Sequence, residues 1–153
     1  MSHRQQIVPN MMLWFSFASL ALLYSVMLLG IYVTASHQGL SCPNWPLCPN
    51  GFGIPSHKYF FEHIHRTTAI ITAVVISVTA VYAIKKKATS VRKTAIAASI
   101  TVAVQILLGM LIVTSKLEPL LVATHLSTGV LVFAMTLMTF ISSYSRTKNN
   151  SYL

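Results

Sequence analysis

Charged side chains are scarce in this chain. Only 8% of its 153 residues are charged, whereas 54% are hydrophobic, and just two are acidic, Glu62 and Glu118. A composition so poor in charge excludes a soluble enzyme. Apolar runs long enough to span a bilayer recur along the chain, so the sequence predicts an integral membrane protein.

Cysteine is scarce as well, since the chain has only two, Cys42 and Cys48. A single pair argues against a membrane thiol–disulfide oxidoreductase, because such enzymes relay electrons through more than one cysteine pair. A zinc site is also disfavoured. Zinc normally takes four ligands, and although His37 and His57 lie in the same loop as the cysteines, the spacing fits no standard zinc finger.

Four apolar segments fill the chain, at residues 9–34, 59–84, 94–115 and 120–144. Each reaches the roughly 20 residues that a helix needs to cross about 30 Å of hydrocarbon. The first segment is too long, and has too weak a cleavage pattern, for a removable signal peptide, so we expect a permanent helix. The predicted fold is an all-α integral membrane protein, a four-transmembrane-helix bundle that forms a single membrane domain over residues 1–153.

The net charge of +9 does not indicate a nucleic-acid partner, because the basic residues are distributed as in a membrane protein. Eight basic residues flank the predicted helices on one side, namely Arg4, Lys85, Lys86, Lys87, Arg92, Lys93, Arg146 and Lys148. Only Lys58 and Lys116 lie in the other two loops. By the positive-inside rule, both termini are predicted to be cytoplasmic and the loop at residues 35–58 extracytoplasmic, in a multi-pass protein of the cell membrane.

The extracytoplasmic loop carries both cysteines, in the run Cys42-Pro43-Asn44-Trp45-Pro46-Leu47-Cys48. An oxidising compartment permits a disulfide, and the two prolines favour a tight closed loop. Two interpretations stay open. The pair is a structural staple, or it is a redox-active pair that exchanges with a partner or accepts electrons, because a short constrained loop strains a disulfide.

Two histidines lie at matched depth in the second and fourth segments. His65 is about six residues into its helix and His125 about five, which places both roughly 8 to 9 Å below the outer boundary at about 1.5 Å per residue. Ala69 and Gly129 follow one turn deeper, and their small size leaves room for a porphyrin edge. A lone membrane histidine often only bonds a neighbouring helix, but two opposed imidazoles suit a six-coordinate haem iron.

Ionisable side chains gather at the same level, and such groups inside a bilayer tend to mark function. Glu62 precedes His65 by three positions and shares its helical face. Arg66 has three possible uses, as a counter-ion for Glu62, as a partner for a haem propionate, or as a snorkelling anchor. His63 points away from the face of His65 and is a weaker candidate ligand. His3, His37 and His57 are expected at the surface.

A faint internal repeat relates the first and third segments. Leu28-Leu29-Gly30, followed by Val33-Thr34, matches Leu107-Leu108-Gly109, followed by Val113-Thr114. Both segments are followed by a helix that carries a histidine. The repeat predicts two pseudo-equivalent helical hairpins, which would place His65 and His125 in equivalent positions across an axis along the membrane normal.

These residues resemble a known family. The matching positions are Val33, Thr34, Gly39, Leu40, the run from Ser41 to Cys48, Glu62, His65, Arg66, Gln105, Leu108, Gly109, Thr124, His125 and Leu126. Together they look like the cysteine-containing form of the haem A synthase family, over about residues 28 to 130.

The resemblance implies an oxidoreductase that converts the C8 methyl group of haem O to the formyl group of haem A, the cofactor of terminal oxidases. It implies axial haem ligation by His65 and His125, a catalytic carboxylate at Glu62 and an extracytoplasmic pair at Cys42 and Cys48. The bound group would be haem b, the haem O substrate, or both. Glu62 would exchange protons during the oxidation.

Family members commonly have eight helices in two halves, whereas this chain resembles a half-length version. The implied assembly is one haem per chain or a homo-oligomer, with haem O synthase and terminal oxidase subunits as possible partners. The competing interpretation is a non-catalytic membrane haem b carrier, electron-transfer protein or oxidase assembly factor. Its histidine geometry would be the same, but electron carriage alone requires neither Glu62 nor the cysteine loop.

Overall fold

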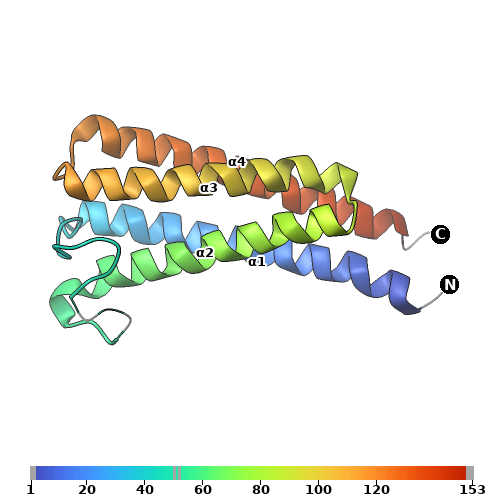
Figure 1. The fold of residues 1–153 in the computed structure, drawn as a ribbon, viewed down its shortest axis with the longest axis horizontal. Helices are drawn as coiled ribbons and strands as arrows, with labels where there is room; N and C mark the ends of the chain where they lie inside the picture. Colours follow the sequence, from blue (N-terminus) through green and yellow to red (C-terminus); the bar gives the residue numbers. More distant parts are fainter. Residues whose placement is uncertain (1–2, 50, 52, 151–153) are drawn as a thin grey trace.

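The protein is a bundle of four long helices (Figure 1). A computed structural model describes residues 3–49, 51 and 53–150, and the side chains of residues 11–49, 51 and 53–149. The helices are α1 (His3–Ala35), α2 (Phe60–Lys85), α3 (Thr89–Thr114) and α4 (Pro119–Asn150), and a short 3-10 turn, η1 (His57–Tyr59), leads into α2. The described residues contain no strand, which confirms the predicted all-α fold.

The four helices form a closed ring. Each helix packs against the next one in sequence, and α1 also packs against α4. The α2–α3 turn lies at the same end of the bundle as both chain ends, and the other two connections lie at the opposite end (Figure 1). Because α2 and α4 are diagonal in this ring, inward side chains on these two helices can face each other across the bundle axis.

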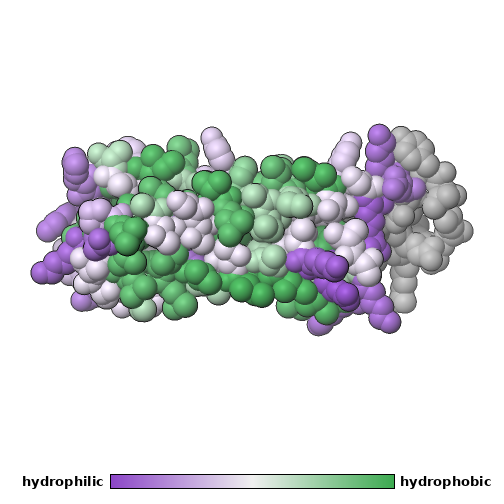
Figure 2. Space-filling model, turned by 90° about the horizontal axis from the view of Figure 1, so that it is seen from above, coloured by the Kyte–Doolittle hydropathy of each residue, from purple (hydrophilic) through white to green (hydrophobic). Residues whose placement is uncertain are grey.

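The surface of the bundle suits a bilayer. All four helices are long and apolar enough to cross a membrane, and large apolar side chains such as Trp14, Ile100 and Leu120 are exposed. Hydrophobic side chains cover the middle of the molecule, and hydrophilic ones gather near its ends (Figure 2). The chain is therefore a multi-pass membrane protein, and which end faces the cytoplasm stays a prediction from the charge distribution.

Small and hydroxyl side chains fill the interior. Ala80, Ala83 and Ala95 are buried at one end of the bundle, and the hydroxyl groups of Ser19 on α1 and Thr79 on α2 are hydrogen-bonded at 3.1 Å. Helices in a membrane gain little from the hydrophobic effect between them, so close packing of small residues and interhelical hydrogen bonds carry much of their association.

Three helices extend beyond their predicted bounds. α1 begins at His3 instead of residue 9, α3 begins at Thr89 instead of residue 94, and α4 continues to Asn150 instead of residue 144. Hydropathy marks only the part of a helix that lies in hydrocarbon. The helix itself continues into polar residues, because each further residue adds a backbone hydrogen bond.

Candidate functional site

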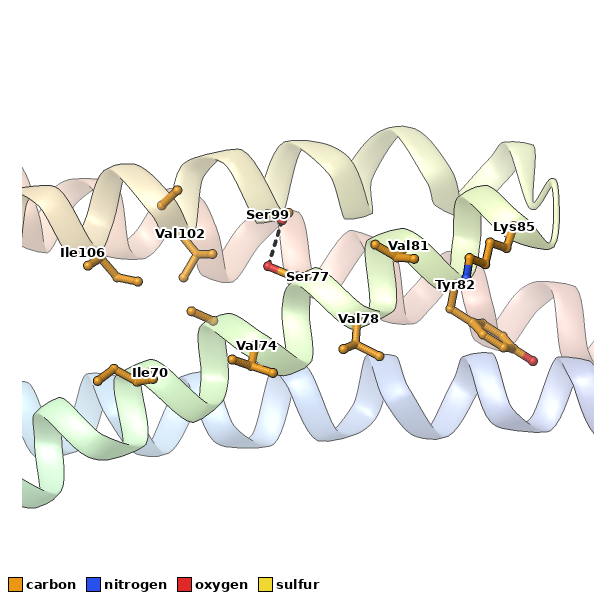
Figure 3. A pocket seen from close by; sticks show the side chains of 12 residues that line it. Ile70, Val74, Ser77, Val78, Val81, Tyr82, Lys85, Ser99, Val102 and Ile106 are labelled. Carbon is orange, nitrogen blue, oxygen red and sulfur yellow. Dashed lines mark hydrogen bonds between the residues drawn. The ribbon is translucent and has the colours of Figure 1, made fainter. Parts of the chain in front are cut away.

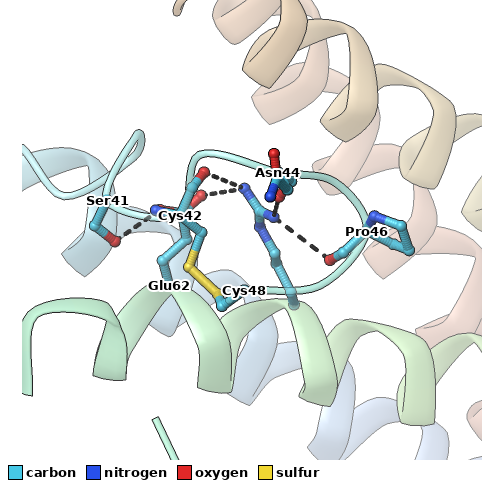
Figure 4. Close-up of a disulfide and its surroundings, with 7 residues drawn as sticks. Ser41, Cys42, Asn44, Pro46, Cys48 and Glu62 are labelled. Carbon is cyan, nitrogen blue, oxygen red and sulfur yellow. Dashed lines mark hydrogen bonds and ion pairs between the residues drawn. A yellow bond between two sulfur atoms is a disulfide. The ribbon is translucent and has the colours of Figure 1, made fainter. Parts of the chain in front are cut away.

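A disulfide between Cys42 and Cys48 closes the loop between α1 and η1 (Figure 4). The two Cα atoms are 4.9 Å apart, and the residues are only 0% and 4% exposed. The predicted pairing of the cysteines is confirmed. Because thiol exchange needs access to a sulfur atom, this burial favours the structural staple over the redox-active interpretation.

Glu62, near the start of α2, fastens the disulfide loop to the bundle. Its residue is 3% exposed, and its Oε2 accepts hydrogen bonds of 2.8 Å from the hydroxyl group of Ser41 and from the backbone N–H of Cys42. Its Oε1 forms an ion pair with the guanidinium group of Arg66, one turn along the helix. A carboxylate offers about four lone-pair positions, so one position on Oε1 stays open.

Arg66 contacts the same loop from the next turn of α2. Its guanidinium group donates to the backbone carbonyls of Asn44, Pro46 and Cys42, in addition to the carboxylate of Glu62 (Figure 4). Of the three uses considered for Arg66, the structure forms the counter-ion pair with Glu62. We call Glu62 and Arg66 together the loop clamp. The pair holds the disulfide loop against the turn of α2 that contains His65.

His65 packs closely against α1. A Cβ atom on Gly30 would lie 2.9 Å from Cε1 of His65, which is closer than real Cβ atoms approach other atoms. The Val26 carbonyl, one turn before Gly30, lies beside the imidazole. Nδ1 of His65 is buried and has no hydrogen-bond partner among the described residues. Position 30 therefore accommodates only glycine while the imidazole keeps this place.

His125 has equivalent surroundings on the other side of the bundle. A Cβ atom on Gly109 would lie 3.7 Å from Cε1 of His125, and the backbone carbonyl of Gln105 lies beside the imidazole. Nδ1 of His125 is likewise buried, with no partner in the described part of the chain. The structure thus places His65 and His125 in equivalent surroundings on the diagonal helices α2 and α4.

The side chain of Gln105 lies in the space beside Gly129. Its Nε2 donates a 2.8 Å hydrogen bond to the backbone carbonyl of His125, and a Cβ atom on Gly129 would lie 3.0 Å from this Nε2. The room for a porphyrin edge at Gly129 stays a prediction. Periodicity shows that a position is small, but only the packed structure shows which neighbour fills the space.

The internal repeat acquires a structural meaning from these contacts. The glycine of each Leu-Leu-Gly motif is the residue that packs against the histidine of the following helix. In each case the carbonyl beside the imidazole belongs to the residue four positions before the glycine. The repeated Leu-Leu-Gly motif is visible in the sequence. The contacts of Gly30 and Gly109 with the histidines, however, became known only once the structure showed which helices pack together.

The remaining histidines lie apart from this pair. His37 and His57 are exposed, as predicted, and His63 is buried near the start of α2. The side chain of His3 lies outside the described residues. His63 is two positions from His65 and off its helical face, so it stays the weaker candidate ligand.

An apolar groove of about 620 Å³ runs along the α2–α3 interface (Figure 3). It extends from Ile70 to Lys85 on α2, and the hydroxyl groups of Ser77 and Ser99 are hydrogen-bonded within it at 3.1 Å. Neither His65 nor His125 lines this groove. Its aliphatic walls offer no strong metal ligand and lie where lipid chains are expected, so we place the candidate site at the two histidines.

The donor set at the candidate site fits a haem better than a bare metal ion. Within the described residues, no three side chains of His, Cys, Asp or Glu gather as a metal cluster. Two imidazoles are too few for a structural zinc site, but they would be enough for a haem iron, because a porphyrin would supply the other ligands. Buried ring nitrogens without partners are unfavourable unless a ligand or a hydrogen bond satisfies them.

Comparison with protein families agrees with this geometry. A family model described as cytochrome oxidase assembly protein (COX15-CtaA) matches residues 53–152, well over half of the chain. The chain belongs to this family, that of the haem A synthases. No individual curated protein matches it. The matched segment contains the loop clamp and both matched histidines, whereas the disulfide loop and Gly30 precede it. Membership gives the chain a role in cytochrome oxidase assembly.

Proposed function

We propose that this protein oxidises the C8 methyl group of haem O to the formyl group of haem A. Family membership supports the broader role in oxidase assembly. The observation that carries the finer proposal is the pair formed by His65 and His125, which come from diagonal helices and pack against equivalent glycines on α1 and α3. Two such imidazoles would supply the protein's ligands to a haem iron.

In this proposal His65 and His125 would hold the iron of haem b or of the haem O substrate, and the haem would supply the redox chemistry. The protein's own part would be orientation. The two histidines would fix the position of the haem, and the apolar helices around them would exclude water. Holding the substrate in a fixed orientation contributes substantially to catalysis, because the reacting groups then meet without a further loss of translational and rotational entropy.

Glu62 is the proposed proton-exchanging group. It lies one turn from His65, and one lone-pair position on its Oε1 is left open by the contacts to Ser41, Cys42 and Arg66. A carboxylate so placed can accept a proton from a reacting group at the outer edge of the site. Arg66 would keep the carboxylate oriented through the ion pair.

A second candidate function is supported by the same contacts. The loop clamp engages Glu62 in holding the disulfide loop, which gives this carboxylate a structural role without any catalysis. A non-catalytic haem carrier or oxidase assembly factor would need the two histidines and a stable fold, and nothing more. The two functions therefore differ in whether Glu62 takes part in turnover.

The proposed setting is the cell membrane, with the disulfide loop on the extracytoplasmic side. A haem O synthase would supply the substrate, and a terminal oxidase would receive the product. A second copy of the chain is proposed as the partner that forms a two-haem unit. Crosslinking an active preparation in mild detergent tests this assembly, and an active preparation that is monomeric throughout would contradict it.

The deciding experiment extracts the haems from cells that express this protein together with a haem O synthase. We expect haem A or its hydroxylated intermediate with the intact protein, and only haem O with His65→Ala. Glu62→Gln should still bind haem but form neither product, because it keeps the shape of the carboxylate without its proton affinity. Unchanged haem O in cells whose protein has a six-coordinate haem spectrum would establish the carrier function instead.

A further inference from the structure

His65 and His125 each belong to an equivalent set of three residues. Each set consists of the histidine, a glycine on the preceding helix, and the residue four positions before that glycine. The sets are Val26, Gly30 and His65, and Gln105, Gly109 and His125. We call the first the α1 seat and the second the α3 seat. Their recurrence in two hairpins indicates a common purpose.

Helix geometry explains why the glycine matters. The backbone carbonyl of Val26 accepts the helical hydrogen bond from the N–H of Gly30, and a carbonyl has a second lone pair. A side chain on a helix points towards the N-terminus and covers the turn before its own Cα atom. Glycine at position 30 therefore leaves the Val26 carbonyl uncovered, and the imidazole of His65 occupies the open space.

The α3 seat follows the same rule. Gly109 leaves the carbonyl of Gln105 uncovered, and the imidazole of His125 lies against it. In both seats the buried ring nitrogen without a partner is Nδ1. A buried donor next to an uncovered carbonyl tends to form a hydrogen bond, because an unpaired polar group in an apolar interior is unfavourable.

We propose that the uncovered carbonyl of each seat accepts the Nδ1–H of the facing histidine, so that Nε2 keeps a free lone pair, and that Gly30 is the positioning residue without which this bond cannot form at the α1 seat. The histidines then present the correct tautomer before any ligand binds. The inference rests on the proposed haem function for its purpose, but the tautomer itself is a property of the protein without haem. Hydrogen bonds of this kind fix the ring plane and the tautomer of metal-binding histidines.

The two seats offer a matched pair of variants. At the α1 seat a methyl group would collide with Cε1 of His65 at 2.9 Å, whereas at the α3 seat it would make an ordinary contact of 3.7 Å with Cε1 of His125. Gly30→Ala should therefore displace its imidazole, and Gly109→Ala should not. Both changes raise helix propensity, so helix propensity taken alone predicts that both variants are neutral or stabilised.

The test records the nitrogen NMR spectrum of protein labelled with ¹⁵N-histidine in detergent without haem, with His65→Ala and His125→Ala to assign the signals. We expect His65 and His125 in the wild type to carry their proton on Nδ1, and His65 in Gly30→Ala to lose this single tautomer. Gly109→Ala should keep both. Wild-type His65 and His125 protonated on Nε2 would overturn the inference, and this outcome is read from the wild-type spectrum whatever the glycine variants do.

A second measurement adds ferric haem b to the same proteins and records the absorption spectrum. Gly30→Ala should lower the affinity for haem b by about tenfold or more, the usual effect of losing a hydrogen bond behind a metal ligand, while Gly109→Ala stays near the wild type. Equal affinities in the two variants would overturn the inference. A wild type that shows the Nδ1–H tautomer but binds no haem would refute the proposed function and leave the seats intact.

Discussion

The loop clamp gives the sharpest test of how the site is held together. Arg66→Met removes the guanidinium group but keeps a side chain of similar length. The carboxylate of Glu62 then stays buried without its counter-ion, and the loop carbonyls of Cys42, Asn44 and Pro46 lose their donor. The expected consequence is that the disulfide loop opens more often.

The structure sets the size of the effect. Removing one partner of a buried ion pair costs about 3–5 kcal/mol. Because the side chain of Arg66 is 10% exposed, water reaches the pair and screens part of its interaction, so we adopt the low end, about 3 kcal/mol. At about 1.4 kcal/mol for each factor of ten, the open population of the loop should increase about 100-fold.

Reduction of the disulfide measures this opening directly. Cys42 and Cys48 are buried in the closed loop, so a reductant reaches them only after the loop opens, and alkylation of the freed thiols records the rate. Lys58→Met is the matched control, because it removes an exposed basic residue near the same loop whose ammonium group lies over the ring of Tyr59. Equal reduction rates for Arg66→Met and the control would refute the protective role of the clamp.

Three further predictions follow from other parts of the structure. His125→Ala should abolish the six-coordinate spectrum of added haem b while the helical circular dichroism is retained; an unchanged spectrum would show that the iron has another ligand. Ser19→Ala should lower stability in detergent by about 0.6 kcal/mol through loss of the bond to Thr79, measured by unfolding, and the effect should vanish in a Thr79→Ala background. In intact cells a membrane-impermeant maleimide should label Ile54→Cys and leave Lys86→Cys unlabelled, and the reverse pattern would invert the topology.

Much of the fold was predictable, because the bilayer restricts what a chain can do. A backbone in hydrocarbon must satisfy its own hydrogen bonds, so four apolar segments of sufficient length imply four helices. The sequence could not give the ends of the helices, since polar residues near Thr89 and Asn150 continue a helix without any change in its hydrogen bonding. It also could not give the ring order that makes α2 and α4 diagonal.

The candidate site was predictable in part. The matched depth of His65 and His125 follows from counting residues along two helices, and the counter-ion role of Arg66 was among the alternatives because it follows Glu62 by four positions. The contacts of the clamp with the disulfide loop were beyond the sequence. They join residues about 20 positions apart through a loop whose path no periodicity describes.

Composition, hydropathy and residue spacing predict four membrane-spanning helices, the titratable side chains within them, and a histidine in the helix that follows each Leu-Leu-Gly motif. These are consequences of composition and of the fixed geometry of a helix. The packing of the helices was needed to show which glycine faces which histidine and that the amide of Gln105 lies beside Gly129. Such pairings depend on how helices rotate and pack against one another, and that is fixed by contacts among all four helices at once rather than by any one segment.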